Sequence, residues 1–383
     1  MMQQYLKTKE EYKDCILFYR LGDFYEMFFD DAKTASKELE LTLTGKACGM
    51  EERAPMCGVP FHSADVYLTR LVKKGYKVAI CEQVEDPKEA KDLVKREVVR
   101  VVTPGTNTYT QSLDETKNNY LASVVYQVDR YGISFADVST GDFYLTEVDS
   151  VRKLYDELNK YNPSEMICNE SFFMSGISTE ELSETLHMLI TAVDASYFDD
   201  DYVKDLLLRH FHVNRLDALG ITEFPVGCVA AGALLSYLLD TQKSDLSHMN
   251  RIVPYANANY MMMDSSTRRN LELVETMREK EKRGSLLWVL DKTKTAMGAR
   301  LLRTYIERPL IHKDEIVKRQ EGIEEFIAHY IEREELREYL NPVYDLERLM
   351  TRIAYQTANP RDLLAFLYSI SNLTGIKTIL SDF

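Results

Sequence analysis

The chain has 383 residues, of which 45% are hydrophobic and 28% are charged, a composition typical of a globular protein with buried cores. It contains no run of about 18 uncharged apolar residues, so we expect no membrane span. The polar N-terminus lacks the apolar core of a secretory signal, which makes the cytoplasm the expected compartment. The net charge of −14 argues against a strongly basic nucleic-acid groove.

The negative charge is unevenly distributed. Residues 1–110 hold 17 Lys and Arg against 18 Asp and Glu, residues 111–250 hold 9 against 23, and residues 251–383 hold 21 against 20. The middle third therefore carries the net acidity. Either outer third can face nucleic acid without a large electrostatic penalty, although its phosphate contacts must be local.

Residues 1–108 alternate between strand and helix patterns, which predicts a small α/β domain. Apolar runs typical of buried strands occupy residues 15–22 and 77–84. A last strand is predicted over residues 96–106 and is broken at Pro104-Gly105.

Two helices are predicted within this domain. One follows Asp30 or Asp31 as its N-cap, and the other begins after Ser63 and ends near Gly75. The stretch 54–63 contains Pro and Gly and is predicted to be a loop.

The rest of the chain divides into two further parts. Residues 109–248 open with alternating apolar and polar residues, which predict an antiparallel meander of about three strands. Helical stretches and a short strand follow, so we expect a second α/β domain. Residues 249–383 have apolar positions at intervals of three and four and predict an all-α region, with a long helical stretch over 267–306.

Motifs for catalysis are scarce. The sequence has no Walker A, Rossmann or zinc-protease pattern, and its six cysteines have no C-x-x-C spacing, so we expect no catalytic residue and no metal site. One alternative is centred on Asp137, because a mid-strand Asp before a hairpin is how ribonuclease-H-like nucleases present a metal carboxylate. Such a nuclease needs at least two more carboxylates within metal reach of Asp137.

The stretch 20–32 places carboxylates among large aromatic side chains. In an extended strand Phe24 and Glu26 point to one side. If their neighbours Tyr25 and Met27 face the core, a ring and a carboxylate stand together on the surface. The ring can stack on an unstacked base, for roughly 1–3 kcal/mol, and the carboxylate can accept a hydrogen bond from a base N–H. The simpler interpretation buries Phe24 and leaves Glu26 in water.

These residues closely resemble the mismatch-recognition motif of the bacterial MutS family of DNA mismatch repair proteins. The resemblance continues in order along the chain, in the stretches 16–26, 55–63, 78–87, 98–106, 263–273, 295–302 and 345–364. It implies an N-terminal mismatch-binding α/β domain, a ribonuclease-H-like connector without a nuclease role, and a helical lever.

By position, the resemblance assigns the mismatch contact to Phe24 and Glu26. The Phe would insert beside the mispaired base from the minor groove and kink the duplex, and the Glu would hydrogen-bond that base. A mismatch bends at a lower cost than paired DNA, so deformability is itself recognised. Further contacts with the DNA backbone or groove are expected at Lys46, Arg53, Pro55, Met56, Cys57, Gly58, Arg96 and Arg100.

The resemblance also implies a clamp, a dimer and an ATPase domain that uses ATP and Mg²⁺, none of which is expected within these residues. We therefore expect a monomeric N-terminal fragment that is not an enzyme, has no cofactor of its own and is cytoplasmic and nucleoid-associated. Its expected partners are double-stranded DNA with mismatches or small insertion loops and, through the connector, other mismatch repair proteins. The remaining alternative is a purely structural or interaction fragment, in which changing Phe24 or Glu26 to Ala has no effect.

Overall fold

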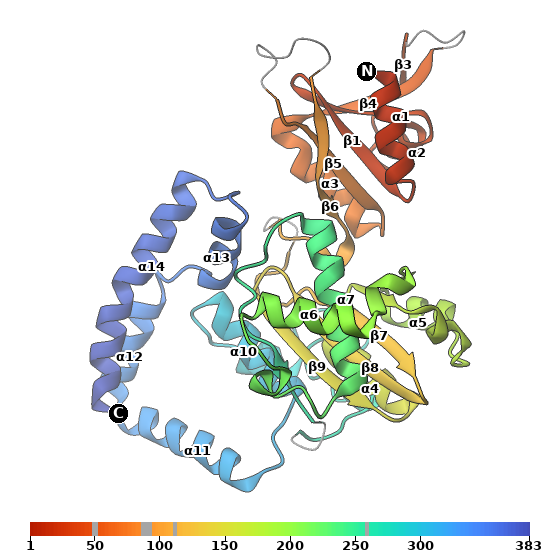
Figure 1. The fold of residues 1–383 in the computed structure, drawn as a ribbon. Helices are drawn as coiled ribbons and strands as arrows, with labels where there is room; N and C mark the ends of the chain where they lie inside the picture. Colours follow the sequence, from red (N-terminus) through yellow and green to blue (C-terminus); the bar gives the residue numbers. More distant parts are fainter. Residues whose placement is uncertain (48–52, 86–93, 110–112, 257–259) are drawn as a thin grey trace.

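The computed structural model describes residues 1–47, 53–85, 94–109, 113–256 and 260–383. These residues form two six-stranded sheets, each with its own helices, followed by a group of helices at the C-terminal end (Figure 1). Within the described parts, no helix is both long enough and apolar enough to traverse a lipid bilayer.

The first sheet has the strand order β3-β4-β2-β1-β5-β6, in which β1 is parallel to β5 and antiparallel to β2. Apolar residues of α2 and α3 pack on one face, and α1 packs on the other. The elements are α1 (Met2–Glu11), β1 (Cys15–Leu21), β2 (Phe24–Phe28), α2 (Phe29–Leu39), β3 (Thr44–Lys46), β4 (Ala54–Pro60), α3 (Ala64–Lys73), β5 (Lys77–Gln83) and β6 (Arg96–Val102).

Two local predictions for this domain are wrong. The stretch 54–63 contains strand β4, because Cys57 and Val59 alternate into the core while the backbone pairs with β2 and β3. Helix α2 begins directly after β2 with Phe28 at its N-cap, so neither predicted Asp cap is used. The predicted N-cap of α3 at Ser63 is confirmed, although its hydroxyl donates to the Pro60 carbonyl and accepts no hydrogen bond from a helix N–H.

The second sheet has the strand order β11-β10-β7-β8-β9-β12. The predicted antiparallel meander is confirmed as β7 (Leu121–Gln127), β8 (Arg130–Asp137) and β9 (Asp142–Val148). Strands β10 (Glu165–Cys168) and β11 (Leu189–Ala192) run parallel to β7, and the short β12 (Val253–Pro254) pairs with β9.

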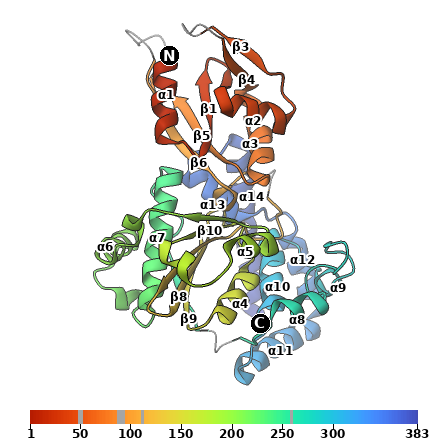
Figure 2. The ribbon, with the colours of Figure 1, turned by 90° about the vertical axis from the view of Figure 1, so that its right-hand side faces the viewer.

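Helices cover both faces of this second sheet. On one face lie α4 (Val151–Tyr161) and α5 (Thr179–Leu186), and on the other lie α6 (Asp200–His210) and α7 (Pro225–Gln242). Figure 2 shows α7 extending from the second sheet toward the first. There Gln242 accepts a hydrogen bond at Oε1 from Arg100 Nε of β6, at 3.0 Å.

The C-terminal region is helical, but residues 267–306 do not form the long helix predicted for them. Residues 271–285 form turns and bends between α8 and α9, since Glu272, Lys280 and Gly284 have positive φ angles that no continuous right-handed helix contains. The helices are α8 (Ser265–Asn270), α9 (Leu286–Leu290), α10 (Ala296–Glu307), α11 (Lys313–Ala328), α12 (Tyr330–Leu340), α13 (Leu346–Ala354) and α14 (Pro360–Ile379).

Candidate nucleic-acid interface

Strand β2 alternates between core and surface side chains. Tyr25 and Met27 are 7% and 0% exposed and pack in the cluster beneath α2 and α3. Phe24 is 47% exposed, and the Glu26 side chain is 16% exposed. The predicted alternation is therefore confirmed, and the interpretation that buries Phe24 is wrong. A ring and a carboxylate share the side of β2 that faces away from α2 and α3.

Helix α1 covers part of this side of β2 and thereby determines which of its side chains are exposed to solvent. Its Tyr5 packs edge-on against Phe28, with the ring centroids 4.9 Å apart, and against Tyr19 at 5.3 Å. Phe28 is 1% exposed as a result. Helix α1 thus buries the C-terminal end of β2 and leaves the Phe24 end uncovered.

Gly58 of β4 lies next to both the ring and the carboxylate. It pairs with Glu26 across the two antiparallel strands. A Cβ at position 58 would lie 3.7 Å from Cδ1 of Phe24, 3.6 Å from Cγ of Glu26 and 3.2 Å from the Tyr25 carbonyl oxygen. Because glycine has no side chain, no side-chain atom of residue 58 stands between Phe24 and Glu26.

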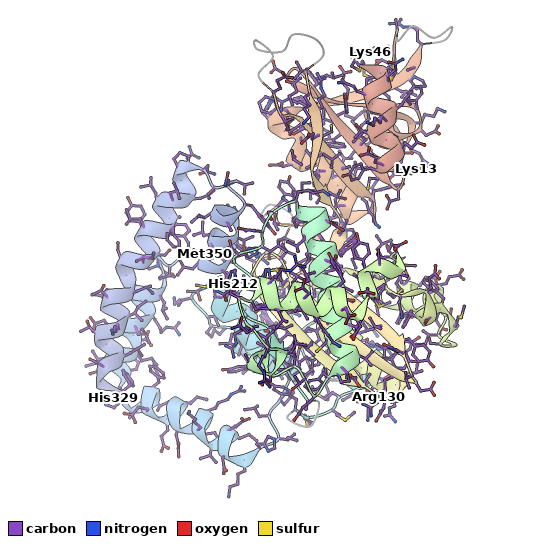
Figure 3. All side chains as sticks on the ribbon, in the orientation of Figure 1. Lys13, Lys46, Arg130, His212, His329 and Met350 are labelled. Atoms are coloured by element: carbon purple, nitrogen blue, oxygen red, sulfur yellow. The ribbon has the colours of Figure 1, made fainter. Side chains whose placement is uncertain are left out.

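The Glu26 carboxylate forms an ion pair with Lys46. Lys46, the last residue of β3, donates from Nζ to Glu26 Oε2 at 2.5 Å, and the two side chains are 33% and 16% exposed. The Lys46 ammonium also lies 5.6 Å from the centroid of the Phe28 ring. Figure 3 shows Lys46 at the end of the first domain that is most distant from the second sheet.

The remaining β3–β4 residues predicted to contact DNA fall on both faces of the sheet. Arg53 is exposed, and Pro55 and Met56 are half-buried on β4. Cys57 is a correction. Its side chain is 1% exposed and its thiol donates to the Ala32 carbonyl under α2, so it faces the core and does not reach this surface.

Arg96 and Arg100 of β6 already have partners within the chain. Arg96 donates from Nε to the Arg20 carbonyl at 2.8 Å and from Nη1 to the Val94 carbonyl at 3.0 Å. Arg100 bonds to Gln242, as described above, and donates from Nη2 to Thr108 Oγ1 at 2.8 Å. These bonds favour a structural role for both arginines, and their contact with phosphate stays a prediction.

The sequence analysis missed a second exposed ring beside Phe24. Phe61 follows β4 and is 43% exposed, and its backbone N–H donates to the Asp23 carbonyl at 2.9 Å. The Arg20 guanidinium stacks over the Phe61 ring at 3.8 Å. Phe61 could have been identified as a bulky residue after Pro60, but its pairing with Arg20 depends on the register of the folded sheet.

The geometry around Asp137 does not support a nuclease. Asp137 is 0% exposed, and its carboxylate accepts hydrogen bonds from Ser139 N and Oγ, Asn118 Nδ2 and the Asn119 N–H, at 2.7–3.0 Å. Asp142 shares the Asn118 amide, and burial together with repulsion from Asp137 raises the pKa of Asp142. Over the described ranges, no group of three or more His, Cys, Asp or Glu side chains is placed to hold a metal ion.

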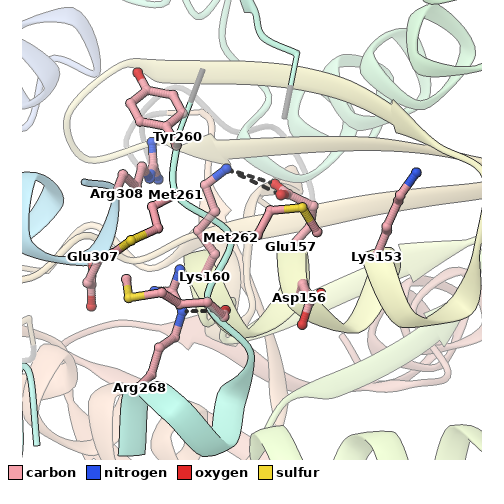
Figure 4. Close-up of a pocket in the computed structure, with 11 residues that line it drawn as sticks. Lys153, Asp156, Glu157, Lys160, Tyr260, Met261, Met262, Arg268, Glu307 and Arg308 are labelled. Atoms are coloured by element: carbon pink, nitrogen blue, oxygen red, sulfur yellow. Dashed lines mark hydrogen bonds and ion pairs between the residues drawn. The ribbon is translucent and has the colours of Figure 1, made fainter. Parts of the chain in front are cut away.

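A small charged cavity lies between the second sheet and the C-terminal helices (Figure 4). Its volume is about 30 Å³. Lys160 pairs with Glu157 at 3.1 Å, and burial lowers the pKa of Lys160 to about 8. The guanidinium of Arg308 stacks over the Tyr161 ring at 3.9 Å. A space of this size holds about two water molecules. We therefore interpret it as part of the interface between the second domain and the C-terminal helices, and not as a ligand site.

The fold and the site define a multidomain protein of α/β and helical parts, with a ring, a carboxylate and an ammonium on one exposed strand face. Residues 1–111 match MutS domain I, residues 119–250 match MutS domain II and residues 266–383 match MutS domain III. The chain belongs to the MutS family.

Its relatives include three bacterial proteins named DNA mismatch repair protein MutS. The chain is 60% identical over 381 residues to that of Lachnoclostridium phytofermentans, 53% over 386 residues to that of Ruminiclostridium cellulolyticum and 50% over 385 residues to that of Acetivibrio thermocellus. The alignments cover 100% of this chain but 41%, 44% and 44% of the relatives. The chain thus spans about two-fifths of the length of these relatives. The predicted domain boundaries at 108/109 and 248/249 stay predictions.

Proposed function

We propose that this chain binds double-stranded DNA at mismatches or small insertion loops and acts in DNA mismatch repair. Family membership supports the proposal, and so does the name of the relatives. The single observation that carries it is the exposed Phe24 ring beside the Glu26 carboxylate on a strand whose other side is buried. An exposed aromatic ring of this size costs hydration free energy, which a stacked base would recover.

In the proposed mechanism Phe24 is the wedge. The ring enters the minor groove at the mispaired step, stacks on the mispaired base and kinks the duplex. Paired bases resist this insertion more strongly, because their stacking and pairing must be broken first. Selectivity therefore arises partly from the DNA and not only from the protein.

Glu26 supplies the polar contact. A carboxylate accepts a hydrogen bond from an N–H of the unstacked base, and a hydrogen bond to a charged group is stronger than one between neutral groups. Near phosphates the same carboxylate is repelled, so it favours sites where a base donor compensates for that repulsion.

The other two domains support this site in the proposal. We assign the second sheet to a ribonuclease-H-like connector, because its strand β7 is antiparallel to β8 and parallel to β10. We give it no nuclease role and propose that its acidic surface faces away from DNA or binds other repair proteins. We assign residues 249–383 to the helical lever.

The test is fluorescence anisotropy at low salt, because phosphate contacts weaken steeply as salt rises. The chain and its Phe24→Ala variant are titrated onto a duplex with one G·T mismatch and onto its matched counterpart. We expect the chain to prefer the mismatched duplex and the variant to lose that preference. Phe173→Ala, on the second domain and with a similar exposed fraction of 46%, is the control and should retain it.

Two outcomes contradict the proposal. Equal affinity of the chain for both duplexes would mean that these residues do not discriminate mismatches, and would favour the structural or interaction fragment, whose acidic middle domain would then be the functional surface. A preference that survives in both Phe24→Ala and Glu26→Ala would mean that other residues recognise the mismatch.

A further inference from the structure

We propose that Lys46 is a specificity-determining residue that controls access to Glu26. In the DNA-free protein its ammonium occupies the carboxylate, and only an unstacked base with an N–H donor displaces it. The displaced ammonium then binds a phosphate. This inference rests on the proposed function and adds to it an exchange of partners that matched DNA does not induce.

The first argument is geometric. The Nζ–Oε2 distance of 2.5 Å is that of a direct, charge-assisted hydrogen bond. Within the described ranges, Lys46 is the only hydrogen-bond donor to the Glu26 carboxylate. A base that approaches Glu26 therefore meets a carboxylate that is already engaged and must replace an existing bond.

The second argument is electrostatic. A free Glu26 carboxylate on a DNA-facing surface would repel every duplex, and a free Lys46 ammonium would attract every duplex. The pair presents almost no net charge to a matched duplex, which offers no unstacked donor. Pairing thus suppresses binding that does not depend on a mismatch.

The third argument concerns mobility. Lys46 ends the three-residue edge strand β3 and reaches Glu26 on a flexible four-carbon stem. The Lys46 side chain is one-third exposed, and so it can rotate away without unpacking the core. The Lys33–Asp30 pair differs, since both of its side chains are well exposed at 59% and 92% and it lies on α2, which packs on the other face of the sheet.

The experiment measures the salt dependence of binding. The logarithm of affinity falls with the logarithm of salt concentration, with a slope of about −0.9 for each phosphate neutralised. Because Lys46 reaches a phosphate only in the mismatched complex, the slope for a G·T duplex should be steeper than that for the matched duplex by about 0.9. Lys46→Met should abolish this difference, whereas the control Lys33→Met should retain it.

Two further variants sharpen the test. Glu26→Gln frees the ammonium, so it should tighten binding to the matched duplex severalfold and steepen its slope by about 0.9. The double variant Lys46→Met/Glu26→Gln should return that slope to the value of the unmodified chain. Lys46→Arg keeps the charge and the reach and should preserve the slope difference, which separates charge exchange from a purely structural role. If Lys46→Met proves poorly folded by circular dichroism, Glu26→Gln and Lys46→Arg still decide the question.

The outcomes separate this inference from the proposed function. A chain that prefers the mismatch through Phe24 but has equal salt slopes for the two duplexes overturns the role of Lys46 alone. So does a slope difference that persists in Lys46→Met, because other phosphate contacts would then cause it. A chain with no mismatch preference overturns the proposed function and this inference together.

Discussion

Tyr5 of α1 and Phe28 of β2 pack edge-on with their ring centroids 4.9 Å apart, and this contact determines where the candidate DNA surface begins. Phe28 and Phe24 lie on the same side of β2, four residues apart. The first is 1% exposed and the second is 47% exposed. The difference arises because α1 reaches one ring and stops short of the other.

Replacing Tyr5 with Ala should destabilise the C-terminal end of β2, where Phe28 packs. Tyr5 is 1% exposed and its hydroxyl accepts a hydrogen bond from the Phe28 N–H at 3.3 Å, so the change removes both packing and a polar partner. We expect the free energy of local unfolding of β2 to fall by about 3–5 kcal/mol, as for other truncations of buried aromatic side chains. Hydrogen–deuterium exchange of β2 amides measures this opening. Tyr202→Ala, at a 43% exposed position, should leave it unchanged.

Replacing Gly58 with Ala should lower mismatch selectivity without unfolding the domain. The added Cβ would stand between Phe24 and Glu26 and would press on the Tyr25 carbonyl at 3.2 Å, a contact that a small strand shift relieves. We expect the G·T preference in anisotropy to fall severalfold while the melting temperature changes by a few degrees. Unchanged selectivity would mean that the base does not approach position 58. In the control Gly322→Ala, on α11, the new Cβ meets no atom within 4 Å, so binding should be unaffected.

The sequence predicts the two faces of β2 because the alternation there is local. Tyr25 and Met27 are large and apolar, and a strand places them together on the core side. The same alternation is present at 54–60, but Pro and Gly there predicted a loop over 54–63, and that prediction is wrong. Strand β4 tolerates them because Pro55 and Pro60 are near its ends and Gly58 stands opposite Glu26.

The Lys46–Glu26 ion pair could not be predicted from the sequence. The two residues are 20 positions apart, and they meet only because β4 pairs with both β2 and β3. The sequence predicts Lys46 only as a contact with the DNA backbone or groove. The registers of two strand pairs set its partner, and local residue patterns do not encode such registers.

Arg308 should hold the C-terminal helices against the second sheet. Arg308 is 9% exposed, and its guanidinium stacks over Tyr161 at 3.9 Å and over Tyr144 at 5.5 Å. Arg308→Met removes this desolvated cation–aromatic contact, which is worth about 2 kcal/mol. We expect faster proteolysis between the second sheet and α10 and a larger radius of gyration in small-angle scattering.

The control for Arg308 is an exposed pair of the same kind. Arg333 stacks over Tyr330 at 4.9 Å, but that ring is 62% exposed. Arg333→Met should change neither proteolysis nor scattering, because a solvated cation–aromatic pair contributes little. Equal effects of the two substitutions would show that burial at Arg308 has no special role.

Lys160 should make the stability of the interface between the second domain and the C-terminal helices depend on pH. Burial lowers its folded-state pKa to about 8, below the value of about 10.4 expected for an unfolded lysine. Between these values the unfolded chain binds more protons at this residue than the folded chain, so Lys160 contributes a free energy of unfolding that rises as the pH increases from 8. The buried thiols act in the opposite direction, because burial raises their pKa values above that of an unfolded cysteine, about 8.5. The contribution of Lys160 is therefore measured as a difference between variants, from urea midpoints followed by circular dichroism at pH 8 and pH 9.5. Lys160→Met should lose stability relative to the unmodified chain over this interval, whereas Lys153→Met, at a side chain that is 41% exposed, should change in parallel with it. An equal change in the chain and in Lys160→Met would mean that this lysine does not titrate in that window.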